Sequence, residues 1–353
     1  MRAGGRSSAT AVSTPASTTP KQGVRKHMDL AQATDLIRSS ALAQHADVLI
    51  RNLALSARLQ IEDAPKATHS DAVTSHFGGL PSLTTNIAWP RWDREAYLHS
   101  QVARLKDSFA KNPRGIVLRD VVARIQEELT HAVIPLAFLG QLELRELHSV
   151  APLPGWPCEG TLAFFYSWPE QVWGFDPLSR GHCRVCYCPT TERTASLPAP
   201  DDLPKDARFP EHTVSFASEW TLPTSVDSDG VALSFWGNDD YYDLCLQIMN
   251  VEDEHCPIHR CGGHPQQIHG NMPLECQLVT SGLYYGGQSG CLDPRMPALA
   301  RGAADWRLLL QIDSDTEQLG WMWGDVGRVY FWARQHDIAR LDFAGAWALL
   351  QCY

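Results

Sequence analysis

Hydrophobic and polar positions along the chain predict a mixture of helices and short strands. From Asp29 to about Gln60, apolar residues recur at three- and four-residue spacing, which predicts an N-terminal helix. Residues 134–144 are nearly all apolar, as in a strand buried on both faces. Further strands are predicted at 162–166, 183–188, 274–279, 306–312, 328–332 and 347–352, and further helices at 241–251 and 337–341. We therefore expect an α+β fold with mostly antiparallel sheets.

Residues 91–132 interrupt this pattern of strands with two helical stripes. Val102, Leu105 and Phe109 share one helix face, and a second stripe runs from Val121 to Leu129. The second half of the chain has no counterpart, so we expect a helical insert.

Several motifs occur twice in the same order. Gly78, Gly79 and Pro81 form a Gly-Gly-x-Pro turn, and Gly262, Gly263 and Pro265 form another. Each is followed by an apolar run that ends in a glutamine and an acid, at Gln141 and at Gln311, and then by a glycine that leads an aromatic strand. A repeated order of unlike elements predicts duplication of one unit. Repeat one would span about 77–196 and repeat two about 211–353, with a proline-rich boundary between them.

Composition narrows the class of protein. The chain has 353 residues, of which 44% are hydrophobic and 20% charged, as in ordinary globular proteins. Its net charge of -10 argues against nucleic-acid binding, which requires lysine and arginine to replace phosphate counterions. No stretch approaches the roughly 20 apolar residues of a membrane span. We expect a cytoplasmic protein with reduced thiols and no cofactor.

Residues 1–27 differ from the rest. They are rich in serine, threonine and alanine, and they contain basic but no acidic residues. Because an apolar core segment is missing, they do not resemble a secretory signal. We expect a disordered tail, separate from one domain at 28–353; a transit peptide and an upstream start codon are the alternatives.

The cysteines and histidines include one cluster with metal-ligand spacing. Cys256 and His259 have a two-residue spacing that suits a zinc knuckle, and Cys261 would add a third ligand. No clean pair of C-x-x-C knuckles accompanies them. We therefore expect no metal site and keep these three residues as weak candidates.

Acidic and amide side chains occur at matching places in the two halves of the chain. Asp176, Asp313 and Asp325 follow aromatic or apolar runs in the two halves, and Gln141 and Gln311 lie inside apolar strands. If the repeats pack face to face, these side chains would line an acidic cleft that holds calcium or a small basic ligand. The alternative is that the aspartates cap turns and the glutamines hold backbone groups across the two repeats.

The ordered motifs resemble the YwqG-like family, a bacterial domain of unknown function. The resemblance covers about residues 77–352 and rests on the two turns, on Trp89-Pro90, and on the runs 136–142, 160–165, 173–177 and 323–332. It implies one α+β fold made of two intertwined repeats. The longer insert and the cysteines Cys256 and Cys261 depart from the family pattern.

Two functions follow as hypotheses. Some family members are encoded near toxin-secretion genes, so the resemblance implies a protein-binding or accessory role, such as an immunity protein that neutralises a bacterial toxin. The alternative is a small-ligand-binding protein or hydrolase-like enzyme that uses the acidic cleft.

Overall fold

The computed structural model describes residues 28–62, 73–111, 118–168, 170–191, 194–251, 256–287 and 292–353. The predicted disordered tail at 1–27 lies outside these residues.

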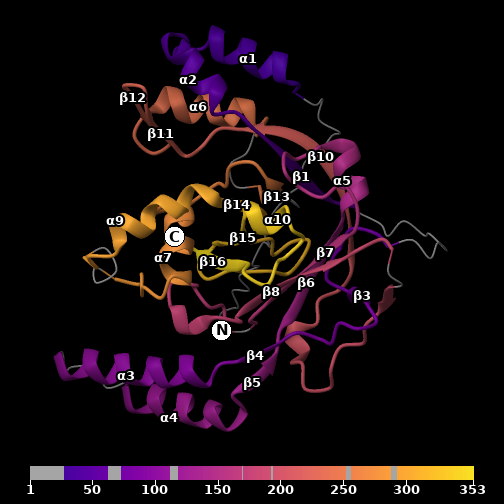
Figure 1. The fold of residues 1–353 in the computed structure, drawn as a ribbon, viewed down its shortest axis with the longest axis vertical. Coiled ribbons are helices and arrows are strands. Elements are labelled where there is room, and N and C mark those ends of the chain that lie inside the picture. Colours follow the sequence, from indigo (N-terminus) through magenta and orange to yellow (C-terminus); the bar gives the residue numbers. More distant parts are fainter. Residues whose placement is uncertain are drawn as a thin grey trace, which may run out of the picture.

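The centre of the fold is one ten-stranded sheet that curls until it is nearly barrel-shaped (Figure 1). Its strand order is β16-β15-β14-β13-β1-β10-β2-β6-β7-β8, and all neighbouring strands are antiparallel. The strands are β1 (Ala54–Ile61), β2 (His76–Phe77), β6 (Ala137–Glu143), β7 (Thr161–Tyr166), β8 (Cys183–Cys188), β10 (His212–Thr221), β13 (His259–Gly262), β14 (Trp306–Asp313), β15 (Arg328–Arg334) and β16 (Trp347–Gln351). The predicted α+β class with mostly antiparallel pairing is confirmed.

The sheet consists of two similar halves that exchange one strand. β10-β2-β6-β7-β8 form one half, and β1-β13-β14-β15-β16 form the other in the same order. β1 precedes repeat one in the sequence but pairs with β13 of repeat two, whereas β10 begins repeat two but pairs with β2 at the start of repeat one. β1 and β10 pair with each other at the centre. The two repeats are therefore intertwined, and neither half of the sheet is built from a continuous piece of chain.

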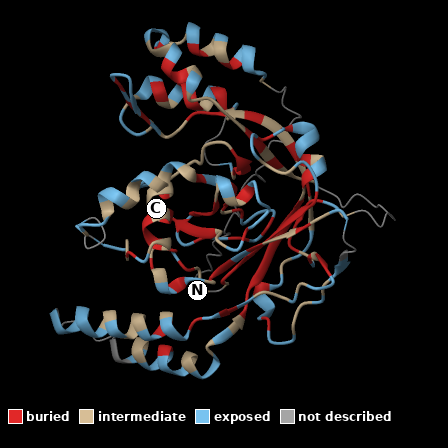
Figure 2. Ribbon diagram, in the orientation of Figure 1, coloured by how far each residue is buried: buried red, intermediate tan, exposed pale blue. Residues whose placement is uncertain are grey.

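The inner faces of the two halves pack on each other to form the main core. Phe164 of β7 and Phe331 of β15 meet with ring centroids 5.2 Å apart. Both rings are fully buried, as are Leu139 and Leu310 beside them. Buried residues accordingly concentrate in the strands, while the outer helices are largely exposed (Figure 2).

Three groups of elements cover the outer faces. A cap of α1 (Leu30–Ser39), α2 (Ala46–Arg51), α6 (Asp239–Ile248) and the hairpin β11 (Ser225–Ser228)–β12 (Val231–Ser234) packs as its own apolar cluster beside β1 and β10. α7 (Met272–Thr280) covers the outer side of β14–β16. The predicted insert forms α3 (Glu95–Lys111) and α4 (Leu118–Glu128), with β4 (Arg91–Asp93) and β5 (Val133–Pro135) paired at its base. The shorter elements are β3 (Ser82–Thr84), β9 (Thr194–Ser196), α5 (Leu144–Val150), α9 (Met296–Leu299) and α10 (Gln335–Ile338).

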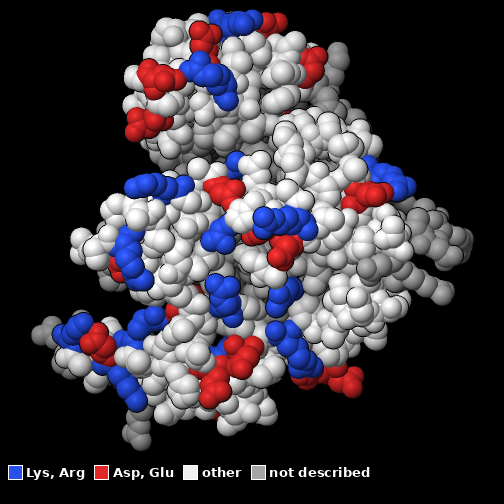
Figure 3. Space-filling model, in the orientation of Figure 1, with Lys and Arg blue, Asp and Glu red and all other residues white. Residues whose placement is uncertain are grey.

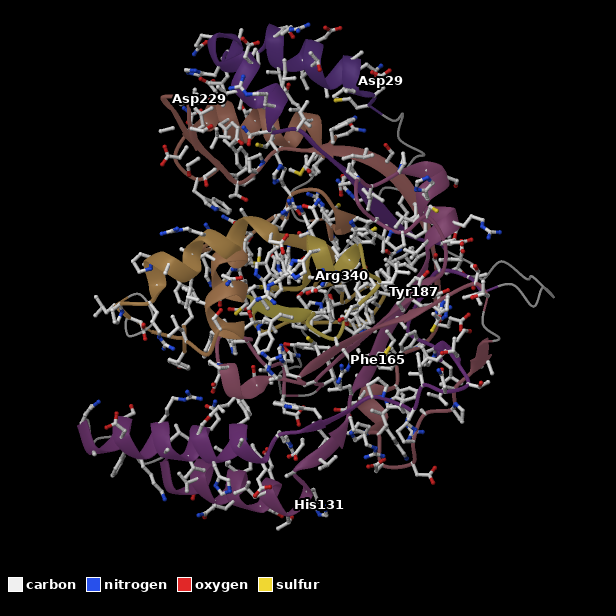
Figure 4. All side chains as sticks on the ribbon, viewed as in Figure 1. Asp29, His131, Phe165, Tyr187, Asp229 and Arg340 are labelled. Carbon is white, nitrogen blue, oxygen red and sulfur yellow. The ribbon has the colours of Figure 1, made fainter. Side chains whose placement is uncertain are left out.

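The side-chain view places the cap and the insert at opposite ends. Asp29 and Asp229 lie in the cap, and His131 lies at the end of the insert (Figure 4). Asp29 caps α1 by accepting a hydrogen bond from the backbone N–H of Gln32. Asp229 joins the β11–β12 hairpin to α2 through an ion pair with Arg51.

Two predicted elements are wrong. The chain beyond Arg51 is not helical, because Leu55, Ala57 and Leu59 alternate with Ser56 and Arg58 and form strand β1. Residues 274–279 are helical rather than extended. Asn271 caps this helix by accepting a hydrogen bond from Leu274 N, and Pro273 occupies its first turn.

Candidate functional site

The two predicted glutamines hold the Gly-Gly-x-Pro turns in place. Gln141 accepts a hydrogen bond from Ser82 N at 2.8 Å and donates one to Thr74 O at 2.9 Å. Gln311 does the same with Gln266 N and Ile258 O, both at 2.8 Å. Each glutamine therefore clamps the turn of its own repeat, and not backbone across the two repeats. Both side chains are fully buried.

The glycines of these turns are required by conformation. Gly78, Gly79, Gly262 and Gly263 have φ values of 64°, 70°, 68° and 64°, which only glycine adopts readily. At Gly78 a Cβ atom would lie 1.9 Å from the carbonyl oxygen of Pro210, so any larger residue would displace the chain there.

Asp176 belongs to the contact between the insert and the sheet. Its carboxylate forms an ion pair with Arg104 of α3 and accepts a hydrogen bond from Leu178 N at 3.0 Å. The Arg104 guanidinium also lies 4.4 Å from the ring centre of Tyr284. Asp176 therefore docks the insert on the body of the protein.

Asp313 lies at the end of β14, two residues after Gln311, and is buried. Its Oδ2 atom accepts hydrogen bonds from Ile258 N at 3.0 Å and from Arg328 Nε at 2.9 Å, and its Oδ1 atom accepts one from Ser314 N at 2.9 Å. Asp325 is exposed. Within the described contacts, Gln311 and Asp313 share one site, whereas Asp176 is part of the insert contact.

The weak zinc candidates do not form a site. His259 and Cys261 lie on β13 with their side chains in the buried interior, where His259 packs against Phe77 at 5.4 Å. Cys256 is exposed. In the described part of the chain, no three His, Cys, Asp or Glu side chains form a group that could hold a metal ion. The strand geometry explains this, because a strand that buries two potential ligands in the core removes them from Cys256.

A pocket of about 450 Å³ opens beside Asp313, between the cap and repeat two. We call it the arginine pocket, because Arg260 of β13 and Arg328 of β15 line it. Its other described lining residues are Leu222, Thr224, Phe235, Trp236, Cys245, Leu246, Met249, Cys256, Pro257, Pro265, Gln266, Gln267, Asp313, Ser314, Val326 and Tyr353. The cap contributes apolar walls, while repeat two contributes the charged ones.

Arg260 belongs to a buried ionic network on the face of the sheet toward the cap. Glu219 of β10 accepts hydrogen bonds from Arg58 of β1 at 2.9 and 2.6 Å. Arg260 Nε lies 3.1 Å from Glu219 Oε1, which is an ion pair without hydrogen-bond alignment. Burial lowers the pKa of Arg260 to about 10, against the attraction of Glu219. Glu219 remains ionised because the two arginines outweigh the burial that opposes ionisation, and its pKa is lowered.

A larger pocket of about 760 Å³ adjoins the first. We call it the tryptophan pocket, because Trp156, Trp220, Trp306 and Trp332 line it. The two pockets share Thr224, Pro265 and Gln267, so the turn at Gly262–Pro265 stands between them. His264 of this turn is held by a 2.9 Å contact between Nε2 and Asn52 O, and burial lowers its pKa to about 4.

The motifs in the sequence do not point to the arginines of the pocket. Arg260 and Arg328 each occur within a predicted or observed strand whose neighbours are buried. A lone arginine in such a strand is the available signal, because arginine is almost never fully buried without a partner.

The fold and the pocket define an α+β protein with a duplicated, strand-exchanged sheet and a ligand-sized cavity under a helical cap. None of the helices in the described ranges has the length and apolar character needed to cross a membrane. The family described as domain of unknown function (DUF1963) matches residues 75–352. The chain therefore belongs to this family. No curated protein matches it.

Proposed function

We propose that this protein binds a small organic ligand in the arginine pocket. The observation that carries the proposal is the pair Arg260 of β13 and Arg328 of β15, which line the wall of a cavity of about 450 Å³. Pockets for small ligands typically enclose about 300–1,000 Å³, with apolar walls and a few polar groups. The cap supplies such apolar walls through Leu222, Phe235 and Leu246.

Binding is better supported than hydrolysis. A general base needs a free lone pair directed at the substrate. Asp313 already accepts three hydrogen bonds, two at Oδ2 from Ile258 N and Arg328 Nε and one at Oδ1 from Ser314 N, which leaves one acceptor site at Oδ1. The ion pair with Arg328 favours a role in fixing the orientation of that guanidinium over activation of water.

The proposal is tested by screening a library of small organic compounds for stabilisation of the protein, because a ligand that binds only the folded state raises the unfolding temperature. Compounds that stabilise the protein are then tested on Leu246→Trp, which fills the cavity from α6. Loss of stabilisation in this variant is expected. Hits that act equally on Leu246→Trp would place binding elsewhere and contradict the proposal.

A protein partner is a second candidate, favoured by exposed apolar side chains on the lining of the same pocket. Trp236, Val326 and Tyr353 are 60%, 54% and 66% exposed. Under the YwqG-like assignment this partner would be a bacterial toxin that the protein neutralises. Mixing the protein with toxins encoded beside its gene tests this. A complex that Trp236→Asp weakens supports it, and toxins that stay active and unbound contradict it.

A further inference from the structure

We infer that the ligand of the arginine pocket is an organic anion with an apolar body, such as a medium-chain or aryl carboxylate. This inference rests on the proposed binding function and adds the chemical class of the ligand. Two independent features support it, namely the local balance of buried charge and the apolar surface opposite the charged wall.

The charge balance beside the pocket is positive. Arg58, Arg260 and Arg328 contribute three positive charges, and their side chains are 19%, 1% and 11% exposed. Among the described residues, Glu219 and Asp313 are the carboxylates that pair with them. Three positive charges minus two negative charges leave an excess of one.

An uncompensated buried charge is costly, and its cost falls when an opposite charge binds next to it. Asp325, the neighbour of the lining residue Val326, does not compensate it, because Asp325 is exposed and water screens its charge. The face of the protein drawn in Figure 3 carries both signs of charge. An anion in the arginine pocket would therefore restore neutrality where the described chain does not.

The wall of the pocket opposite the arginines favours a ligand with an apolar body. Leu222, Phe235, Leu246 and Met249 come from the cap and the chain leading to it, and they face a cavity with no described acidic side chain other than Asp313. Inorganic phosphate or sulfate would leave these side chains in contact with water. A carboxylate with an alkyl or aryl body would cover them and gain the hydrophobic contribution of its CH₂ groups.

The test compares three probes of equal chain length, octanoate, 1-octanol and octylammonium, by isothermal titration calorimetry on the full chain. We expect octanoate to bind at least about tenfold more tightly than octanol, in line with a charge-assisted contact to arginine. We expect octylammonium to bind most weakly. Leu246→Trp should abolish the binding of all probes.

A matched pair of variants isolates the charge. Val326 is exposed on the pocket lining and has φ of 50°, a conformation that Asn and Asp tolerate. Val326→Asp and Val326→Asn have nearly the same shape and differ by one charge. Octanoate should bind roughly fivefold more weakly to Val326→Asp than to Val326→Asn, as expected for two charges separated by several ångströms near a surface. Octanol should not distinguish the two variants.

The outcomes separate the two claims. If octanol or octylammonium binds as tightly as octanoate, and Leu246→Trp abolishes that binding, the anion inference is overturned while the binding function stands. Equal octanoate affinity for Val326→Asp and Val326→Asn also overturns the anion inference. If no probe binds, the inferred ligand class is overturned, and the library screen decides whether the proposed function stands. If probes bind and Leu246→Trp leaves their binding unchanged, the proposed function itself fails.

Discussion

Replacing Gln311 by glutamate tests the role of the buried amide clamps. In the native protein Oε1 accepts a hydrogen bond from Gln266 N, and Nε2 donates one to Ile258 O. A carboxylate keeps the first bond but directs a second acceptor oxygen at the Ile258 carbonyl. Only the protonated acid can restore both bonds. We therefore expect Gln311→Glu to fold with a neutral side chain and to depend on pH.

The magnitude follows from the free energy of protonation. An ordinary glutamate has a pKa of about 4.3, and holding it neutral costs about 1.4 kcal/mol for each pH unit above that value. The expected loss of unfolding free energy is at most about 5 kcal/mol at pH 8 and about 1.6 kcal/mol at pH 5.5. These figures are upper bounds, because Arg260, which pairs with residue 311 in the sheet, attracts an ionised glutamate and lowers the cost. The sign is fixed, because raising the pKa of an acid in the folded state makes stability fall as pH rises through the range above its unfolded pKa.

Urea unfolding of wild type and variant at several pH values measures this loss, and subtraction of the wild-type values removes the titration of other groups. Gln311→Leu is the control. It leaves the same backbone groups unpaired, at a cost of about 3 kcal/mol that should not vary with pH. Gln141→Glu should behave like Gln311→Glu, because its bonds to Ser82 N and Thr74 O have matching lengths. If Gln311→Glu loses the same unfolding free energy at pH 5.5 and at pH 8, the hydrogen bond from the Gln311 amide to the Ile258 carbonyl is not what the side chain contributes, and the reasoning is refuted.

Three further predictions concern other buried or strained groups. Burial lowers the pKa of His182 and of His264 to about 4, so the stability that each contributes is complete above an unfolded pKa of about 6.5 and is lost as pH falls toward 4. About 3 kcal/mol per histidine should disappear between pH 7 and pH 4 in urea titrations, and His264→Asn should remove its share of this dependence. Glu219→Gln should lower the unfolding free energy by about 3–5 kcal/mol, because Arg58 and Arg260 lose their shared counterion; an unchanged denaturation midpoint would show that the network is not strongly coupled. Val326→Asn should stabilise the protein by roughly 1 kcal/mol in thermal unfolding, because Asn adopts positive φ more readily than a β-branched residue; a lower unfolding temperature would contradict this.

Local patterns in the sequence predicted much of the fold. The runs at 306–312, 328–332 and 347–352 form β14, β15 and β16, because each is a continuous apolar segment of strand length. The helix predicted to continue to about Gln60 was wrong beyond Arg51. The helical spacing of three and four residues includes Leu49 and Leu53, and it was taken to continue past the end of α2. The alternation from Leu55 to Leu59, with a period of two, was present in the same segment.

The exchange of β1 and β10 could not be predicted from local patterns. Long-range packing decides which strand pairs with β13. The eight residues of β1 do not by themselves specify a partner strand. The different surroundings of Asp176, which contacts the insert, and of Asp313, which lines the arginine pocket, could not be predicted for a similar reason. Asp176 is neutralised by Arg104, which lies on the insert and is 72 positions away in the chain. Its environment depends on how the insert docks, and the residues around Asp176 do not encode that.

The duplication also gives an internal comparison for the arginine pocket. Arg260 pairs in register with Gln311, and the residue that pairs with Gln141 in the other half is His76. Arg328 pairs with Asp313 in this half of the sheet. In the other half Glu143 occupies the place of Asp313, and the residue that pairs with it is Thr161.

The third arginine is also absent from the other half of the sheet. Arg58 pairs with Arg260, and at the equivalent place in the other half Thr213 pairs with His76. One half of the sheet thus builds the same strands, turn and glutamine clamp with none of the three arginines. The fold does not require a buried guanidinium at these positions. Retaining three of them in one half, beside a cavity and in excess over their carboxylate partners, is better explained by a ligand than by stability, because buried ion pairs rarely stabilise a protein more than apolar packing does.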